Sequence, residues 1–411
     1  MPDEEKKPWL DKREEVRGSG LHALIIGVSD YQYLPAANQF PDLNRVTLGL
    51  SKVNIPATGA YRVANWFKTN FWHPTVKVKT IRLLLSPSTD EMAQKDFPEL
   101  AKFTKTKVDP DSAMPYIRAT TAEVRQAMLD WQKDCRGHSD DMSVLYVSGH
   151  GVQWGSKDDG IVLLEDFSAD QLFMDYSIDV GGTMKGMAGD DMPQTQFYFV
   201  DACRITPEEF QKQQYSGAPK RLASNFAGQD LRAAPIYFAA CPQTKAKGNP
   251  GRGTYFAEAL VDCLESEQQG PIPGSALTVA QRYWHVSISS LFARLQDRVS
   301  LVAKPDGEKQ DVVMGGNGRD AVLCARETPP LVRVVVEVNP EDAAKLASAE
   351  LWNELHDNRI RERQACIPRP LQMQDVAPGV YTLDITATAP YQGKSISVVA
   401  QPPEWRKPIS I

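Results

Sequence analysis

The sequence has no long apolar run. No stretch of its 411 residues approaches the roughly 20 consecutive apolar residues that a membrane-spanning helix needs. The opening segment, MPDEEKKPWLDKREEV, is charged where a secretory signal peptide would be apolar. These two absences predict a cytoplasmic protein with no membrane partner.

Basic clusters and metal-ligand spacings are also missing. The net charge is −6 without a basic patch, so the chain carries no electrostatic footprint for nucleic acid or for an anionic membrane. Neither the histidines nor the cysteines show a zinc-ligand spacing, and there is no CxxC pair, so we expect reduced thiols and no disulfide framework. The cysteines are Cys135, Cys203, Cys241, Cys263, Cys324 and Cys366. The partner that remains is a protein or a peptide.

Apolar strand-like runs alternate with helical segments through the first three quarters of the chain. Strands are predicted at 21–29, 75–87, 143–149, 195–202 and 234–241, and helices at 57–70, 120–135, 254–266 and about 277–299. This alternation predicts an α/β fold with a parallel-rich sheet and helices on both faces.

The sequence pattern changes at Thr328-Pro329-Pro330, where segments typical of strands begin to alternate with turn signals. A helix-like patch at 341–355 interrupts them. We predict three parts: a charged arm at 1–19, an α/β domain at 20–326 and a small antiparallel β-sandwich at 331–411. The turn VAPGVYTLD in the last part resembles prealbumin-like or PEGA-like accessory domains.

Two apolar runs, SVLYVSGHG and TQFYFVDACR, each lead into a reactive side chain, His150 in the first and Cys203 in the second. Both read as buried strands, and in a parallel sheet the carboxyl ends of strands share one edge. The two side chains are therefore predicted to meet although 53 positions separate them. Taken singly, each has a plainer interpretation: Cys203 as a buried structural thiol and His150 as a hydrogen-bonded loop histidine.

A cysteine acts as a nucleophile through its thiolate, so it needs a base nearby. His150 offers that base. The flanking glycines, Gly149 and Gly151, allow a sharp loop whose backbone amide could join the Cys203 amide in an oxyanion hole.

A strand ending in SGHG, followed about 50 residues later by a strand ending in DACR, resembles the caspase and metacaspase clan of cysteine peptidases. The resemblance extends over 21–325 and includes the GVSDY, APIYFAAC and GTYFAEAL segments. It implies a caspase-like fold, a catalytic dyad of His150 and Cys203, and oxyanion donors at Gly151 and Cys203.

The residue two places before the cysteine bears on specificity. Metacaspases have Asp there, and Asp201 matches it, which implies cleavage after Arg or Lys. Ser148 matches a second pocket position. The clan's helical N-D-A motif is absent, because Gly59 precedes Ala60, and Asp30 is the candidate replacement. The plainer interpretations are a strand-end cap for Asp201 and a surface turn for Asp30.

The resemblance raises two further expectations about the site. Calcium is the one cofactor left open, through the acidic residues Asp158, Asp159, Glu165 and Asp166, although they lack EF-hand spacing and a solvated loop is favoured. The polar loop at 205–230 is a candidate for self-cleavage at Lys212, Lys220 or Arg221.

The proteins that the chain resembles act in regulated cell death or antiviral defence, with a gasdermin-like pore former or a regulatory protein as substrate. The alternative is a catalytically silent caspase-fold module that holds partners.

Overall fold

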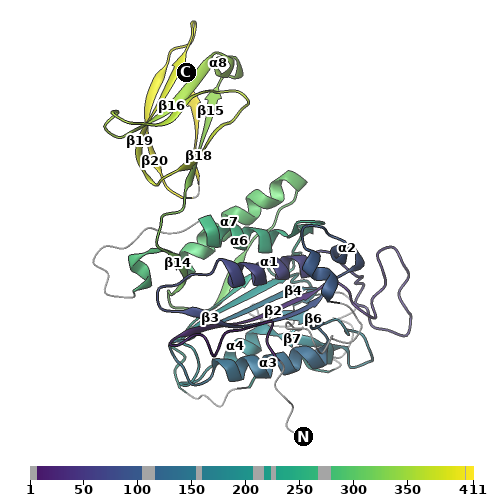
Figure 1. The fold of residues 1–411 in the computed structure, drawn as a ribbon. Helices are drawn as coiled ribbons and strands as arrows, with labels where there is room; N and C mark the ends of the chain where they lie inside the picture. Colours follow the sequence, from purple (N-terminus) through teal and green to yellow (C-terminus); the bar gives the residue numbers. More distant parts are fainter. Residues whose placement is uncertain are drawn as a thin grey trace. The chain divides into compact units, whose positions relative to one another are not determined.

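The computed structural model describes residues 7–103, 116–153, 160–206, 217–223, 228–266, 279–402 and 404–411 (Figure 1). They form two compact units. The first comprises the described residues up to Cys263 together with Ser287–Cys324, and the second comprises those in Leu264–Val286 and Ala325–Ile411. The predicted boundaries at 20–326 and 331–411 stay predictions.

A seven-stranded sheet forms the centre of the first unit, in the order β1-β3-β2-β4-β8-β9-β13. The five inner strands are parallel, and the edge strands β1 and β13 are antiparallel to their neighbours. The predicted parallel-rich α/β fold is therefore confirmed. The strands are β1 (Leu10–Asp11), β2 (Gly20–Val28), β3 (Lys77–Ser86), β4 (Met142–Gly149), β8 (Thr195–Ala202), β9 (Ala233–Phe238) and β13 (Val313–Gly318).

Helices cover both faces of this sheet (Figure 1). Helix α1 packs on β2, β3 and β4 with α6 and α7 on the same side, whereas α3 and α4 lie on the other side. Thr120 caps α3 as predicted, because its hydroxyl accepts a hydrogen bond from the Glu123 amide at 3.4 Å. The helices are α1 (Pro56–Thr69), α2 (Thr89–Met92), α3 (Thr121–Cys135), α4 (Val180–Gly186), α6 (Tyr255–Ser266) and α7 (Ile288–Ala303), with short 3-10 turns at Pro98–Lys102, Phe173–Tyr176, Ala280–Arg282 and Lys304–Asp306.

Both faces of the inner strands are buried, which explains their continuous apolar sequences. All nine residues of β2 are buried, and the cluster on one side of the sheet includes Leu24, Val147, Val200 and Trp131 of α3. The strands are thus held rigidly, and so are the residues that follow their carboxyl ends.

One sequence prediction in the α/β part of the chain was wrong, and one strand was missed. The helix expected at about 277–299 begins only at Ile288, because Ser287 caps it and the aromatic and β-branched residues before it form strand β12 (Trp284–Ser287). Strand β13 was missed because its sequence, VMGGNG, is rich in glycine.

Smaller strands surround the carboxyl end of the sheet. A three-stranded sheet is formed by β5 (Gly151–Val152), β6 (Ile161–Leu163) and β7 (Ser177–Asp179). A short hairpin is formed by β10 (Gly248–Asn249) and β11 (Gly253–Thr254), immediately before α6.

The second unit contains two sheets that share one apolar core, as expected for a β-sandwich. Their orders are β18-β15-β21 and β17-β16-β19-β20, and the β15–β21 pair is parallel, so the sandwich is mixed and not purely antiparallel. The helix-like patch is helical only in α8 (Glu341–Lys345) and continues as a strand. The strands are β15 (Val332–Asn339), β16 (Ala347–Asn353), β17 (Arg359–Ala365), β18 (Leu371–Val376), β19 (Gly379–Ala387), β20 (Lys394–Ala400) and β21 (Glu404–Ser410), with β14 (Val322–Arg326) before them.

None of the helices in the described parts of the chain has the length and apolar character needed to cross a membrane.

Candidate active site

Strands β4 and β8 are neighbours, and their register brings His150 and Cys203 to the same edge of the sheet. Gly149 pairs with Ala202 at the last step of the ladder. His150 and Cys203 are the next residue on each strand. The two reactive side chains that the sequence singled out therefore follow adjacent strands at matched positions.

The backbone of Gly151 lies against Cys203. A Cβ atom at position 151 would be 2.4 Å from the Cys203 carbonyl oxygen and 2.7 Å from the Ala202 Cβ, so only glycine fits. This close approach brings the main chain after His150 alongside the cysteine. It agrees with the predicted use of both residues as amide donors, which stays a prediction.

The His150 ring is held in one tautomer by the protein backbone. Its Nε2–H donates to the Ser51 carbonyl oxygen at 2.6 Å, since a carbonyl can only accept, and the Nδ1 atom is left with the lone pair. The His150 amide donates to the Tyr31 hydroxyl at 2.7 Å, and the two rings lie 4.9 Å apart. Nδ1 is thus the atom that can take up a proton.

Burial lowers the pKa of His150, and the hydrogen bond to Ser51 opposes this effect only in part. Burial also raises the pKa of the Cys203 thiol, against the positive charge of Lys245. The Cys203 Sγ donates to the Ala246 carbonyl oxygen at 3.7 Å. Both shifts favour the neutral forms at rest, a thiol at Cys203 and an uncharged imidazole at His150.

Asp201 is buried beneath this edge, with 1% of its surface exposed. Its Oδ2 atom accepts hydrogen bonds from three hydroxyls, those of Tyr146 at 2.5 Å, Ser148 at 3.3 Å and Thr254. Its Oδ1 atom is buried as well and has no hydrogen-bond partner among the residues that the structure describes. All three hydroxyls donate to Oδ2, so Oδ1 is left to accept a hydrogen bond from a further donor.

Burial raises the pKa of Asp201 to about 6, although the three hydroxyls act in the opposite direction. The carboxylate is therefore costly to keep ionised without a cation beside it.

The missing N-D-A motif has a structural explanation. Gly59 of α1 faces the hairpin before α6, and a Cβ atom there would be 2.9 Å from the Thr254 hydroxyl oxygen. Thr254 also accepts a hydrogen bond from the Ala257 amide at 3.1 Å, which caps α6. An aspartate at position 59 would displace the hydroxyl that now contacts Asp201.

Asp30 has a different setting from the one expected of a pocket residue. Its carboxylate forms ion pairs with Lys52 at 2.7 Å and with Arg118 at 2.9 Å. Its charge is balanced by the protein itself, so Asp30 is a weaker candidate for binding a substrate cation than Asp201.

The acidic residues considered for calcium do not gather into one site. Asp158 and Asp159 lie outside the described residues. Glu165 is buried against Arg118 and the Ser86 hydroxyl, and Asp166 accepts hydrogen bonds from the Thr121 amide and hydroxyl. Within the described ranges, no group of three His, Cys, Asp or Glu side chains is arranged to hold a metal ion.

Of the three candidate cleavage residues, Lys212 also lies outside the described residues. Lys220 is paired through its backbone with β7: its amide donates to the Ser177 carbonyl at 2.7 Å, and its carbonyl accepts from the Asp179 amide at 2.8 Å. The Arg221 side chain is 68% exposed.

Sequence reasoning missed four residues that contact the candidate site: Tyr31, Ser51, Tyr146 and Thr254. Tyr146 could have been found, because it lies two places before Ser148 on the same face of β4. Ser51 acts through its backbone carbonyl, for which the sequence carries no signal.

The chain was compared with known proteins and with protein-family models. No curated protein matches the sequence significantly. Among solved structures, caspase-1 from Spodoptera frugiperda is similar, with 13% identity, a TM-score of 0.41, and an alignment that covers 79% of this chain and 99% of that chain. A family model described as the caspase domain, Peptidase C14, matches residues 21–316. The chain therefore belongs to the caspase-domain family of cysteine peptidases.

Proposed function

We propose that the protein is a cysteine endopeptidase in which Cys203 is the nucleophile and His150 is the general base. The observation that carries this proposal is the register of β4 and β8, which puts both side chains just past a matched pair of residues. The hydrogen bond from Nε2 to the Ser51 carbonyl supports it, because it keeps the lone pair on Nδ1.

The Cys203 thiol transfers its proton to His150 during the reaction. Nδ1 of His150 takes the thiol proton as the Cys203 sulfur attacks the peptide carbonyl, and the negative charge moves to the carbonyl oxygen. The backbone amides of Gly151 and Cys203 are the proposed donors to that oxygen. The imidazolium then protonates the leaving amine, a thioester remains, and a water molecule deprotonated by His150 hydrolyses it to the carboxylic acid and the free thiol.

Asp201 is the proposed selector of a basic residue before the scissile bond, with Ser148 in support. A buried carboxylate oxygen without a donor is rare, because the desolvation is otherwise uncompensated. An Arg or Lys side chain would supply both the hydrogen bond and the countercharge.

The physiological setting follows from the resemblance in the sequence. We propose a role in regulated cell death or antiviral defence in the cytosol, with a gasdermin-like pore former or a regulatory protein as the cleaved partner.

A panel of fluorogenic peptides with Arg, Lys, Asp or Leu before the scissile bond tests both the reaction and its specificity. We expect hydrolysis of the Arg and Lys peptides and at least about tenfold lower kcat/KM for Asp and Leu, because a buried carboxylate repels acids and gains nothing from apolar groups. Preference for Asp or Leu would refute the Asp201 assignment. Binding of a partner protein without turnover of any peptide would favour the silent scaffold.

Self-cleavage of the 205–230 loop is part of the proposal. Lys212, Lys220 and Arg221 are the candidate residues, and the exposed Arg221 side chain is accessible for recognition. Cleavage at Lys220 or Arg221 requires the backbone pairing of Lys220 with β7 to open first, so we expect it to be slow.

Intact-mass measurement of purified wild type and Cys203→Ala tests this expectation. The wild type should accumulate two fragments over time, and the alanine variant should stay intact until catalytic amounts of wild type are added. Equal fragments in both samples would indicate a contaminating protease, and an active wild type that stays whole would exclude self-cleavage.

A further inference from the structure

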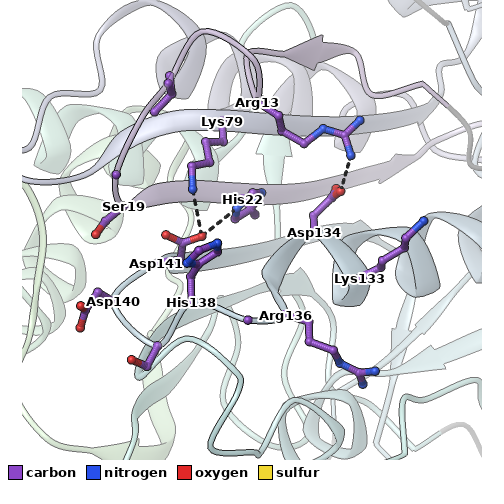
Figure 2. A pocket seen from close by; sticks show the side chains of 14 residues that line it. Arg13, Ser19, His22, Lys79, Lys133, Asp134, Arg136, His138, Asp140 and Asp141 are labelled. Atoms are coloured by element: carbon purple, nitrogen blue, oxygen red, sulfur yellow. Dashed lines mark hydrogen bonds and ion pairs between the residues drawn. The ribbon is translucent and has the colours of Figure 1, made fainter.

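A cavity lies at the opposite edge of the sheet from Cys203, within the same compact unit. Its volume is about 690 Å³, within the usual range for small-molecule sites. It is lined by the amino ends of β2 and β3, the end of α3 and the turn before β4 (Figure 2). The eight residues of β4 separate it from His150, a distance of about 25 Å at roughly 3.3 Å per residue.

Lys79 reaches into this cavity because of an irregularity in the sheet. Leu21 pairs with Val78 and the next residue, His22, pairs with Thr80, so Lys79 is an extra residue in β3. Such a β-bulge redirects a side chain out of the regular alternation of the strand.

Gly20 makes room for the redirected side chain. A Cβ atom at this position would lie 2.1 Å from the Lys79 Cδ and 2.4 Å from its Cγ, so a larger residue at position 20 would force the lysine stem to move from its present course across β2. Two separate backbone features, a bulge and a glycine, thus put one ammonium group at the floor of the cavity.

The Lys79 ammonium group makes fewer hydrogen bonds in the cavity than it can donate. Lys79 is 8% exposed, and its three N–H donors have one acceptor in the described part of the chain, the Asp141 Oδ2 atom at 3.4 Å. Asp141 is already engaged, since its Oδ1 atom accepts a hydrogen bond from the Gly20 amide at 2.7 Å. Its Oδ2 atom contacts His22 Nε2 at 3.2 Å (Figure 2). A buried cation with unused donors needs a further acceptor.

The fixed charges around the cavity are close to balanced. The lining has four cationic side chains, Arg13, Lys79, Lys133 and Arg136, against three carboxylates. Arg13 also pairs with Asp11 at 2.6 Å and Arg136 with Asp191 at 3.2 Å, while Asp134 pairs with Arg82 at 2.8 Å. The preference for an anion therefore comes from the unused donors of the Lys79 ammonium group and not from a net charge of the lining.

We propose that this cavity binds a small anionic molecule whose phosphate or carboxylate group pairs with the Lys79 ammonium. Phosphate and carboxylate oxygens are the acceptors that a lysine point charge takes, and the cavity has space for the rest of a nucleotide-sized or smaller ligand. The site is independent of the proposed peptidase chemistry.

Isothermal titration calorimetry of the full chain with inorganic phosphate, ATP and citrate tests the proposal and separates the sources of the anion. Binding of phosphate and ATP indicates a phosphate site, and binding of citrate alone indicates a carboxylate site. We expect Lys79→Gln to weaken the observed binding by about 10- to 100-fold. The matched control is Lys77→Gln, which removes an exposed lysine from the start of the same strand and should change affinity less than about twofold.

Absence of saturable binding of all three anions below about 10 mM would overturn the proposal, as would equal affinity in Lys79→Gln and wild type. Circular dichroism verifies that each variant is folded. If Lys79→Gln does not fold, Arg136→Gln at the exposed rim gives the second test, with a several-fold loss expected and unchanged affinity contradicting the site.

Discussion

Replacement of Cys203 by alanine is expected to abolish peptide hydrolysis while the protein stays folded. The thiol is the only proposed source of the covalent intermediate, so its loss should lower kcat by several orders of magnitude. The side chain is half-buried and forms one weak hydrogen bond, to Ala246, so the cost in stability should be small. Steady-state kinetics on an Arg peptide and thermal unfolding of both proteins give the comparison.

His150→Ala should give a loss of similar size, because the thiol has a raised pKa and needs a base to ionise. Cys241→Ala is the matched control: this cysteine is also partly exposed and follows the neighbouring strand β9. Its activity should stay within about twofold of the wild type, since surface substitutions seldom perturb a fold. A Cys203→Ala variant with more than about a tenth of wild-type turnover would contradict the assignment of the nucleophile.

The sheet, and the position of the two reactive residues at one edge of it, could be predicted from the sequence because buried parallel strands have a strong signal. β2, β4 and β8 are short, continuous apolar runs, and their order in the sheet follows from ordinary α/β connections. The position of His150 and Cys203 directly after two of these runs was sufficient to bring them to one edge.

Contacts made by backbone atoms and by distant loops could not be predicted. The Ser51 carbonyl that fixes the His150 tautomer belongs to a loop residue whose side chain is irrelevant to the contact. Thr254 reaches Asp201 from a hairpin that is 53 residues further along the chain, and only the packing of α1 at Gly59 explains its position. The bulge at Lys79 likewise has no signature in the sequence, because it is a property of strand pairing.

The free energy that it costs to bury an ionised Asp201 supports a role for this carboxylate in binding the substrate. Folding raises its pKa to about 6 from an ordinary value near 3.8, so its contribution to stability is present below about pH 4 and is lost as the pH rises through 6. Wild type should therefore lose about 2 kcal/mol of unfolding free energy relative to Asp201→Asn between about pH 4 and pH 7. Chemical denaturation at both pH values measures the difference, and it separates loss of function in the variant from loss of fold.

Asp201→Asn should have its main effect on substrates with a basic residue. Removing the charge leaves the Arg side chain of the substrate buried without its counterion, so we expect kcat/KM for Arg peptides to fall by about 30- to 1,000-fold, or roughly 2–4 kcal/mol. Ser148→Ala is the graded comparison: it removes one hydroxyl from Oδ2 but leaves the carboxylate and the unpaired Oδ1 in place, so we expect a smaller loss than in Asp201→Asn.

The pH dependence identifies the carboxylate as the group responsible. In wild type, kcat/KM for the Arg peptide relative to that for the Leu peptide should increase as the pH rises through about 6, because the neutral acid cannot pair with a cation and the ionised form can, whereas the titration of His150 affects both peptides alike. The asparagine variant should lack this increase, and Ser148→Ala should keep it. If Asp201→Asn retains both the Arg preference and the rise near pH 6, another acidic group binds the substrate. Asp201 would then have a structural role only.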